Sequence, residues 1–184
     1  MPIEATTKIN YDSYRQYYLF SFFQGTRSPW QARILMALAP LLFITFLVLY
    51  LLNPADFFNL AGMAIMMLLG LVLLLIIILV PKRYYKSVEK LITIPNRYVF
   101  SEDQLEITLM DPVQDGQTTA RYATLNKVYE TADAFYIYLT ASQSCIVGRQ
   151  DFTHGTAEDL HKLLASRLGQ RFEVTKSARK LYPA

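Results

Sequence analysis

Two long runs without a charged residue constrain this chain more than any other feature of its sequence. Residues 34–52 read ILMALAPLLFITFLVLYLL, and residues 60–80 read LAGMAIMMLLGLVLLLIIILV. Each reaches the roughly 20 apolar residues that an α-helix needs to cross a hydrocarbon core about 30 Å thick. A helix that is apolar on every side is stable only in a membrane or inside a large protein core. We therefore expect both runs to be transmembrane helices.

The connection between these runs, residues 53–59, is short enough to make the two helices an antiparallel hairpin. Its charged residue is Asp56, whereas Lys and Arg gather at the outer ends of both runs. Because basic residues are retained in the cytoplasm, we expect both termini of the chain to be cytoplasmic. The resulting membrane-interface basic cluster has six members: Arg27, Arg33, Lys82, Arg83, Lys86 and Lys90.

The basic cluster would lie at the level of anionic lipid headgroups, where each cation contributes ~1 kcal/mol of attraction. Membrane topology alone accounts for its position. Recognition of a specific phosphorylated headgroup is a sharper hypothesis that the same residues leave open. The interiors of the runs hold Thr45 but no ionisable group, so nothing there indicates an ion or proton path.

The segments that flank the hairpin have patterns of their own. Residues 1–33 form an N-terminal segment in which the aromatic stretch 11–23 predicts a helix, with Asn10 as its N-cap. That helix could lie along the membrane interface or pack on the C-terminal domain, and residues 3–9 could be a strand or unstructured. Residues 81–96 predict a juxtamembrane basic helix that continues to Pro95.

From residue 97 onward the hydrophobic period changes from helical to two. Alternating side chains predict strands, and their short connections predict antiparallel hairpins in a meander; the strands are 105–109, 118–122, 127–131, 135–139 and 144–148. Pro112 to Gly116 is expected to be a loop. Thr156 begins a capping-box pattern and Gly169 follows the last apolar position, which predicts a helix between them. Residues 97–169 are thus an α+β domain, and the tail 170–184 need not fold.

The motifs of this domain resemble the YcxB-like family of bacterial membrane proteins. They are Tyr-x-x-Leu-x-x-Val-x-Glu-Thr at residues 122–131, Phe-Tyr-Ile-Tyr-Leu at 135–139, and a helix after Phe152, preceded by two spans and a basic junction. The resemblance implies the cytoplasmic (inner) membrane of a bacterium and a pleckstrin-homology-like fold, a bent antiparallel sheet capped by a C-terminal helix. It implies core positions for Tyr122, Leu125, Val128 and Phe152, and it brings no catalytic residue.

The other chemistry-bearing residues form no recognised constellation. His154 and His161 with Asp151 and Asp159 lack the spacing of a metal site, and Asp151 with Glu158 lacks a companion nucleophile. The lone Cys145 excludes an internal disulfide and alternates like a small core residue. The formal net charge of +3, without a basic run in the domain, argues against a nucleic-acid partner. We expect no cofactor, no metal and no catalytic residue.

Function is less constrained than architecture. The leading hypothesis is a membrane-anchored, non-enzymatic binding or regulatory module that presents its domain at the cytoplasmic face. Its partners would be the lipid bilayer and an unidentified protein. One alternative is a small accessory subunit whose hairpin packs into a larger membrane complex, and a second is a membrane enzyme that uses His154 or Cys145. Homo-oligomerisation stays open, because Gly62 and Gly70 could permit close helix contact.

Overall fold

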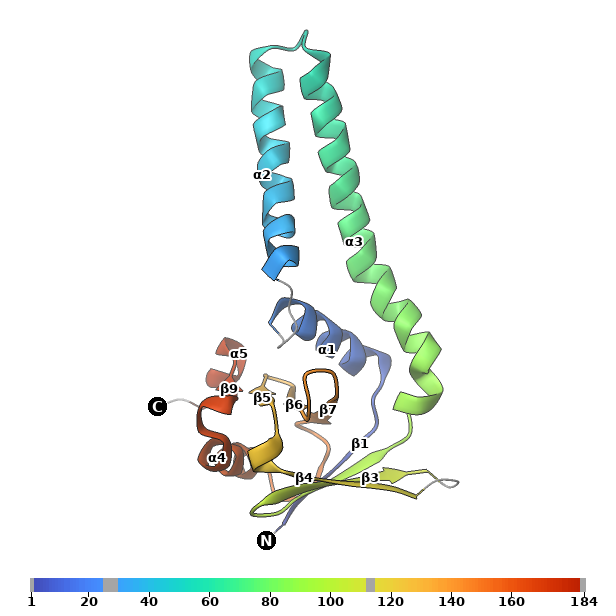
Figure 1. Cartoon of the computed structure of the whole chain (residues 1–184), viewed down its shortest axis with the longest axis vertical. Coiled ribbons are helices and arrows are strands. Elements are labelled where there is room, and N and C mark those ends of the chain that lie inside the picture. The colour runs from blue at the N-terminus through green and yellow to red at the C-terminus, as the bar shows by residue number, and fades with distance from the viewer. Residues whose placement is uncertain (1, 25–29, 112–114, 183–184) are drawn as a thin grey trace. The chain divides into compact units, whose positions relative to one another are not determined.

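The structure is a computed structural model of the full chain, and it describes residues 2–24, 30–111 and 115–182. The side chains of residues 31–33, 35, 36, 91 and 115 are not described. The chain divides into two units (Figure 1): residues 1–17 together with 88–184 form a mixed α/β unit, and residues 18–87 form a helical unit. The mixed unit is therefore built from two separate stretches of the chain.

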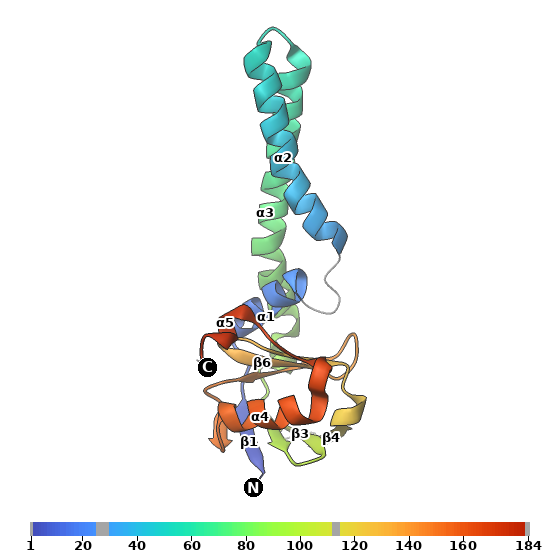
Figure 2. The same ribbon diagram turned by 90° about the vertical axis from the view of Figure 1, so that its left-hand side faces the viewer.

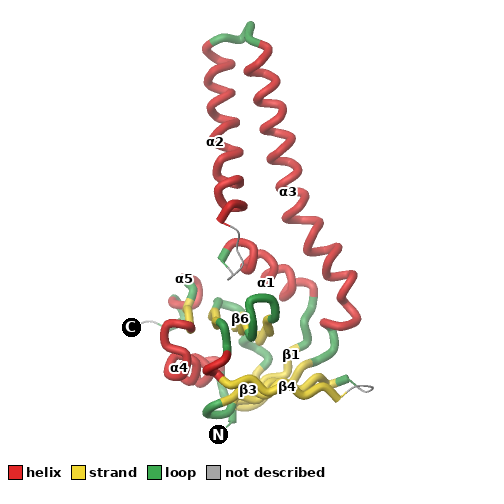
Figure 3. Tube along the Cα trace, in the orientation of Figure 1, coloured by secondary structure: helices red, strands yellow, loops and turns green. Residues whose placement is uncertain are grey.

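Two helices dominate the helical unit (Figure 3). They are α2, Trp30–Leu52, and α3, Phe57–Ile92, which runs through Pro81 without a break. Among the described residues, α3 is the one helix that is long and apolar enough to cross a membrane, with mean hydropathy 3.3 and no burial in its most apolar window. Ala37–Leu52 of α2 is a shorter apolar stretch. The structure thus contains one candidate membrane helix, and the hairpin itself stays a prediction.

Gly62 lies where α3 meets α2. A Cβ at this position would approach the Phe46 ring to 2.6 Å, so the missing side chain makes room for that ring. Gly70 has open space around it and lines an apolar cavity of about 470 Å³ between the two helices. Gly62 is therefore explained by packing between α2 and α3.

The mixed unit contains two sheets. The first has the strand order β4-β3-β2-β1-β8 and the second β7-β6-β5-β9. Their bounds are β1 Ile3–Thr7, β2 Asn96–Phe100, β3 Gln104–Met110, β4 Asp115–Arg121, β5 Lys127–Glu130, β6 Ala134–Tyr138, β7 Ser144–Gly148, β8 Phe152–His154 and β9 Phe172–Val174. The hairpins β3–β4, β5–β6 and β6–β7 are antiparallel, as the alternating sequence predicts, and β2, which was not predicted as a strand, also pairs antiparallel with β3.

Three features of this unit correct the sequence-based expectations. A single antiparallel meander is wrong, because there are two sheets and β5 pairs in parallel with β9. The described part of the predicted tail, residues 170–182, folds as β9 and the short helix α5, Lys176–Arg179, since β5 offers β9 an open edge. Gly116 lies within β4 and pairs with Leu109, so the loop is shorter than expected.

Residues 3–7, left open by the sequence, form a strand inside the first sheet. β1 pairs with β2 on one side and β8 on the other, both antiparallel. Its alternate residues Ile3, Ala5 and Thr7 are buried, which is the pattern of a strand with one face on a core. The mixed unit is therefore complete only when the N-terminal strand is present.

The C-terminal helix α4, Ala157–Leu168, lies beside the sheets (Figure 2). Thr156 caps it with the predicted capping box, because its hydroxyl accepts from the Asp159 amide and Asp159 accepts from the Thr156 amide. Leu160, Leu164 and Leu168 are buried against strand residues of both sheets. This apolar stripe closes the core of the unit.

The core positions implied by the YcxB-like resemblance are apolar neighbours in the structure. Tyr122, Leu125 and Val128 are buried, and Phe152 is half-buried against the same cluster. The Tyr122 hydroxyl donates to the Ser101 carbonyl oxygen at 2.8 Å, which satisfies its polar end. Burial raises the pKa of the Tyr122 hydroxyl above its usual value.

Helix α1, Tyr11–Phe23, begins with the predicted N-cap, since Asn10 Oδ1 accepts from the Ser13 amide at 2.8 Å. Within the mixed unit, the Tyr17 ring lies edge-on to Tyr136 at 5.3 Å, and its hydroxyl is 2.5 Å from Ser144 Oγ. The first part of the aromatic helix thus packs on β6 and β7. This contact explains why every residue of β6 is buried: Tyr17 covers one face and the core covers the other.

Candidate functional site

Four members of the predicted basic cluster lie on one face of α3. At 100° per residue, Lys82, Lys86, Lys90 and Arg83 fall at 0°, 40°, 80° and 100°, so they share about a quarter of the helix circumference. All four side chains are exposed, and none forms a salt bridge with another residue that the structure describes. We call these four residues the basic stripe. Its cations are available to an external anion.

The basic stripe begins directly after the apolar part of α3. Phe57–Val80 is about 36 Å long at 1.5 Å per residue, and Lys82 follows two residues later. A groove of about 240 Å³ is lined by Leu79, Lys82, Arg83 and Lys86. The two other members of the predicted basic cluster cannot be placed relative to the stripe, because Arg27 lies outside the described residues and the side chain of Arg33 is not described.

A second charged assembly lies inside the mixed unit, around Glu130 at the end of β5. Its side chain is fully buried. One carboxylate oxygen, Oε1, accepts from the Arg149 guanidinium and from the Tyr182 hydroxyl at 2.7 Å, while Oε2 lies 2.5 Å from His161 Nδ1. Arg149 also donates to the Tyr182 oxygen at 2.9 Å. We call these four residues the Glu130 network.

The Glu130 network joins four parts of the chain that are distant in sequence. Glu130 belongs to β5, Arg149 follows β7, His161 lies in α4 and Tyr182 is in the tail. The ring of His161 lies 4.4 Å from that of Tyr182, and Thr175 donates from both its amide and its hydroxyl to the Glu130 carbonyl oxygen at 2.9 Å. The network thus connects the tail and α4 to the second sheet through hydrogen bonds. The contacts from Arg149, His161 and Tyr182 compensate for the loss of water around the buried Glu130 carboxylate.

The remaining sequence candidates stay apart from one another. His154 is mostly exposed and 3.9 Å from Glu4, whereas His161 is committed to Glu130. No group of three metal-binding side chains occurs among the described residues. Cys145 is half-buried beside Tyr98, and burial raises the pKa of its thiol to about 11, the opposite of what a nucleophile needs. Asp159 caps α4.

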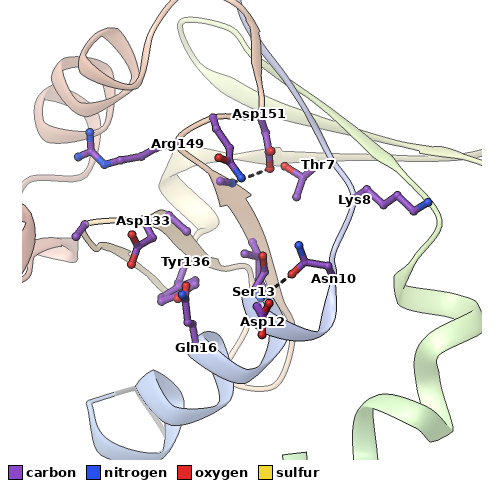
Figure 4. Close-up of a pocket in the computed structure, with 15 residues that line it drawn as sticks. Thr7, Lys8, Asn10, Asp12, Ser13, Gln16, Asp133, Tyr136, Arg149 and Asp151 are labelled. Atoms are coloured by element: carbon purple, nitrogen blue, oxygen red, sulfur yellow. Dashed lines mark hydrogen bonds between the residues drawn. The ribbon is translucent and has the colours of Figure 1, made fainter. Parts of the chain in front are cut away.

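A polar cavity of about 350 Å³ opens between the end of β1, the start of α1 and two turns of the second sheet (Figure 4). The β1–α1 wall includes Thr7, Asp12 and Gln16, and the turn after β5 contributes Asp133. The turn after β7 contributes Asp151, whose Oδ2 accepts from the Gly148 amide at 3.0 Å. This cavity belongs entirely to the mixed unit.

Sequence reasoning missed both the Glu130 network and the polar cavity. Glu130 was visible as a carboxylate directly after the apolar pair Val128 and Tyr129, where a charged side chain needs a partner if the strand is buried. Its partners could not be named, because they are 19, 31 and 52 residues away. The cavity depends on β1, whose place in the sheet the sequence does not reveal.

Comparison with known proteins identifies one segment of the chain. Residues 100–164 match the family model described as YcxB-like protein, from the last residue of β2 into α4. No curated protein and no solved structure was found to match the chain. The matched segment therefore covers most of both sheets, and β1, β9 and Tyr182 lie outside it.

Proposed function

Because residues 100–164 are a YcxB-like segment, we propose that this chain is a non-enzymatic binding or regulatory module anchored in the bacterial cytoplasmic membrane. In this proposal, α2 and α3 form the transmembrane hairpin and both termini are cytoplasmic. The mixed unit is then a pleckstrin-homology-like domain held at the cytoplasmic face, where it binds a protein partner or the headgroup layer. Its two sheets and closing helix α4 support that comparison.

The pairing of β1 with β2 is the observation that carries the proposal. Ile3 pairs with Phe100 and Thr7 with Asn96, so residues 7 and 96 must lie on the same side of any bilayer. The chain between them can then cross a membrane only an even number of times. If α3 crosses, one other helix must cross as well, and α1 with its 13 residues, about 20 Å, is too short. The 23 residues of α2, about 35 Å, are long enough.

The basic stripe supports the orientation. Cations that follow an apolar helix are retained on the cytoplasmic side and meet anionic lipid there. At ~1 kcal/mol for each cation near such a surface, the four residues would contribute up to about 4 kcal/mol. The groove beside Leu79 offers room for part of a lipid headgroup next to three of them.

Cysteine accessibility tests the topology. In a Cys145→Ser background, Ala55→Cys marks the α2–α3 connection and Lys176→Cys marks the tail, and a membrane-impermeant maleimide is added to intact spheroplasts. We expect labelling at residue 55 in intact cells and at residue 176 only after permeabilisation. Labelling of both positions, or of residue 176 alone, in intact cells contradicts the proposal.

Crosslinking in the native membrane tests the binding role. The full-length chain is compared with a chain that ends at Pro95 and with full-length Val128→Asp, in which a charge replaces a fully buried core side chain. We expect captured proteins to be lost in both altered chains, because each lacks a folded mixed unit. Catalytic turnover of a substrate by the purified full-length protein would contradict a non-enzymatic role.

The accessory-subunit alternative is favoured by one observation. The described side chains of α2 and α3 are largely apolar and exposed, and the cavity between them is lined only by apolar residues and Gly70. Such a surface can pack against another membrane protein as well as against lipid. Capture of stoichiometric partners by the chain that ends at Pro95 would favour this alternative.

A further inference from the structure

Among the described residues, the Thr7 hydroxyl is the one buried side-chain polar group that lacks a hydrogen-bond partner. The residue is only 3% exposed. Buried polar side-chain atoms in folded proteins are nearly always paired, because an unpaired one costs folding free energy. A hydroxyl left unpaired at the edge of a cavity is therefore a position where a water molecule or a ligand atom can supply the hydrogen bond.

The Thr7 side chain projects from the end of β1 into the polar cavity, on the side of Asp151 (Figure 4). Three walls of this cavity carry carboxylates: Asp12 from α1, Asp133 from the turn after β5, and Asp151 from the turn after β7. The carboxylates of Asp12 and Asp133 belong to exposed residues and form no hydrogen bond or ion pair with another described side chain, while the Asp133 carbonyl oxygen accepts from the Arg149 amide at 2.9 Å. Asp151 has one oxygen engaged by the Gly148 amide.

The two cations in the lining do not neutralise these carboxylates. The Arg149 guanidinium is committed to Glu130 and to the Tyr182 hydroxyl, and Figure 4 shows it pointing away from the cavity. Lys8 is exposed and also extends away from the cavity in that view. The charged side chains of the lining that are left without a cation are thus the three carboxylates, and apart from the two cations its other polar side chains are neutral.

We propose that this cavity binds a small ligand through a protonated primary amine. An ammonium group has three N–H donors and no acceptor, so it suits a cavity that offers an unpaired hydroxyl oxygen and carboxylates on three walls. An anion would meet three carboxylates and is disfavoured. The amine can belong to a free small molecule or to the ethanolamine headgroup of a lipid. The site is separate from the basic stripe, and the inference does not depend on α2 or α3 crossing a membrane.

Calorimetric titration of the full-length chain in phosphatidylcholine nanodiscs tests the site, with putrescine as the probe. We expect saturable binding of putrescine, at least 10-fold weaker binding of the neutral isostere 1,4-butanediol, and no binding of inorganic phosphate. Nanodiscs that also contain phosphatidylethanolamine identify the source of the amine: competition with putrescine assigns a lipid headgroup, and its absence assigns a free amine. Failure of putrescine to bind in the nanodiscs made only of phosphatidylcholine, or saturable phosphate binding, would overturn the proposal.

Two variants separate a ligand site from a structural role. Asp133→Asn should weaken putrescine binding at least 10-fold, and its exposure means that the fold tolerates the change. Thr7→Val should weaken binding about 3-fold or more and raise the thermal midpoint, because valine keeps the shape and removes the unpaired hydroxyl. Glu102→Gln, at a side chain that is 92% exposed outside the cavity, is the matched control and should bind like the unaltered chain. Equal affinities for the Asp133 and Glu102 variants, or a lower midpoint for Thr7→Val, would refute the assignment.

Discussion

The Glu130→Ala substitution removes the carboxylate on which the Glu130 network depends. Arg149, His161 and Tyr182 all direct a polar atom at its two oxygens. Alanine leaves the backbone of β5 intact, so the Thr175 bonds to the Glu130 carbonyl oxygen can persist. The substitution therefore isolates the side chain's contribution to stability.

The size of the effect follows from what the three partners lose. Removing one member of a buried ion pair costs about 3–5 kcal/mol, because the other charge stays desolvated. Here the Arg149 and His161 side chains retain 19% and 25% exposure, so water can partly replace the carboxylate. We therefore expect the lower end of that range, about 3 kcal/mol of unfolding free energy. Glu130→Gln keeps the shape and one acceptor, and it should cost less than alanine.

Urea unfolding of the full-length chain in detergent, followed by tyrosine near-ultraviolet circular dichroism, measures the effect through the transition midpoint and slope. Glu102→Ala is the matched control, since its side chain is 92% exposed, and it should change stability by less than about 0.5 kcal/mol. The double variant Glu130→Ala/Arg149→Ala should be less destabilised than the sum of the single variants. A loss below about 1 kcal/mol for Glu130→Ala, or additive single variants, would refute the reasoning.

Three further predictions concern single residues. Tyr182→Phe removes the hydroxyl that donates to Glu130 and should cost about 1 kcal/mol, with increased amide exchange in the tail. Gly155→Ala should cost about 1–2 kcal/mol in urea unfolding, because φ is +76° and the new Cβ would lie 3.2 Å from Ile3 atoms. Cys145 should react with iodoacetamide at pH 8 far more slowly than a free thiol, since its pKa is raised to about 11. The thiol also makes the fold alkali-sensitive: its contribution is full below pH 9 and is lost as pH rises toward 11.

Each of these predictions has a control and a result that would contradict it. Tyr84→Phe changes an exposed tyrosine of α3 and should leave stability unchanged; an equal loss at both positions would contradict the role of Tyr182. Gly116→Ala should be tolerated better than Gly155→Ala, because a Cβ there meets Leu109 only at 3.4 Å. Alkylation of Cys145 in folded protein as fast as in urea-unfolded protein would contradict its burial.

Sequence reasoning predicted the local elements of the domain well. Period-two alternation located β3, β5, β6 and β7, and the capping box located the start of α4 at Thr156. These signals lie within a few residues of the elements they predict, because side-chain alternation and capping act locally. The same locality explains the confirmed N-cap at Asn10.

The sequence predicted long-range relations poorly. β1 and β9 are short, and each is stable only because a distant strand offers an edge: β2 and β8 for one, β5 for the other. Tyr182 looked like part of a polar tail until the structure placed it on Glu130. Pairing of strands far apart in the chain leaves no local pattern, so the second sheet's parallel edge and the Glu130 network could not be predicted.

The position of β1 also determines the order in which the chain can be assembled during synthesis. β1 leaves the ribosome first, but its partners β2 and β8 follow about 90 and 145 residues later. At roughly 5–20 residues per second, this strand waits on the order of 10 s before its sheet can form. During that interval α2 and α3 emerge, so in the topology proposed above they would enter the membrane before the mixed unit folds. An exposed strand in a nascent chain is prone to pair wrongly, so β1 is at risk until β2 has been synthesised.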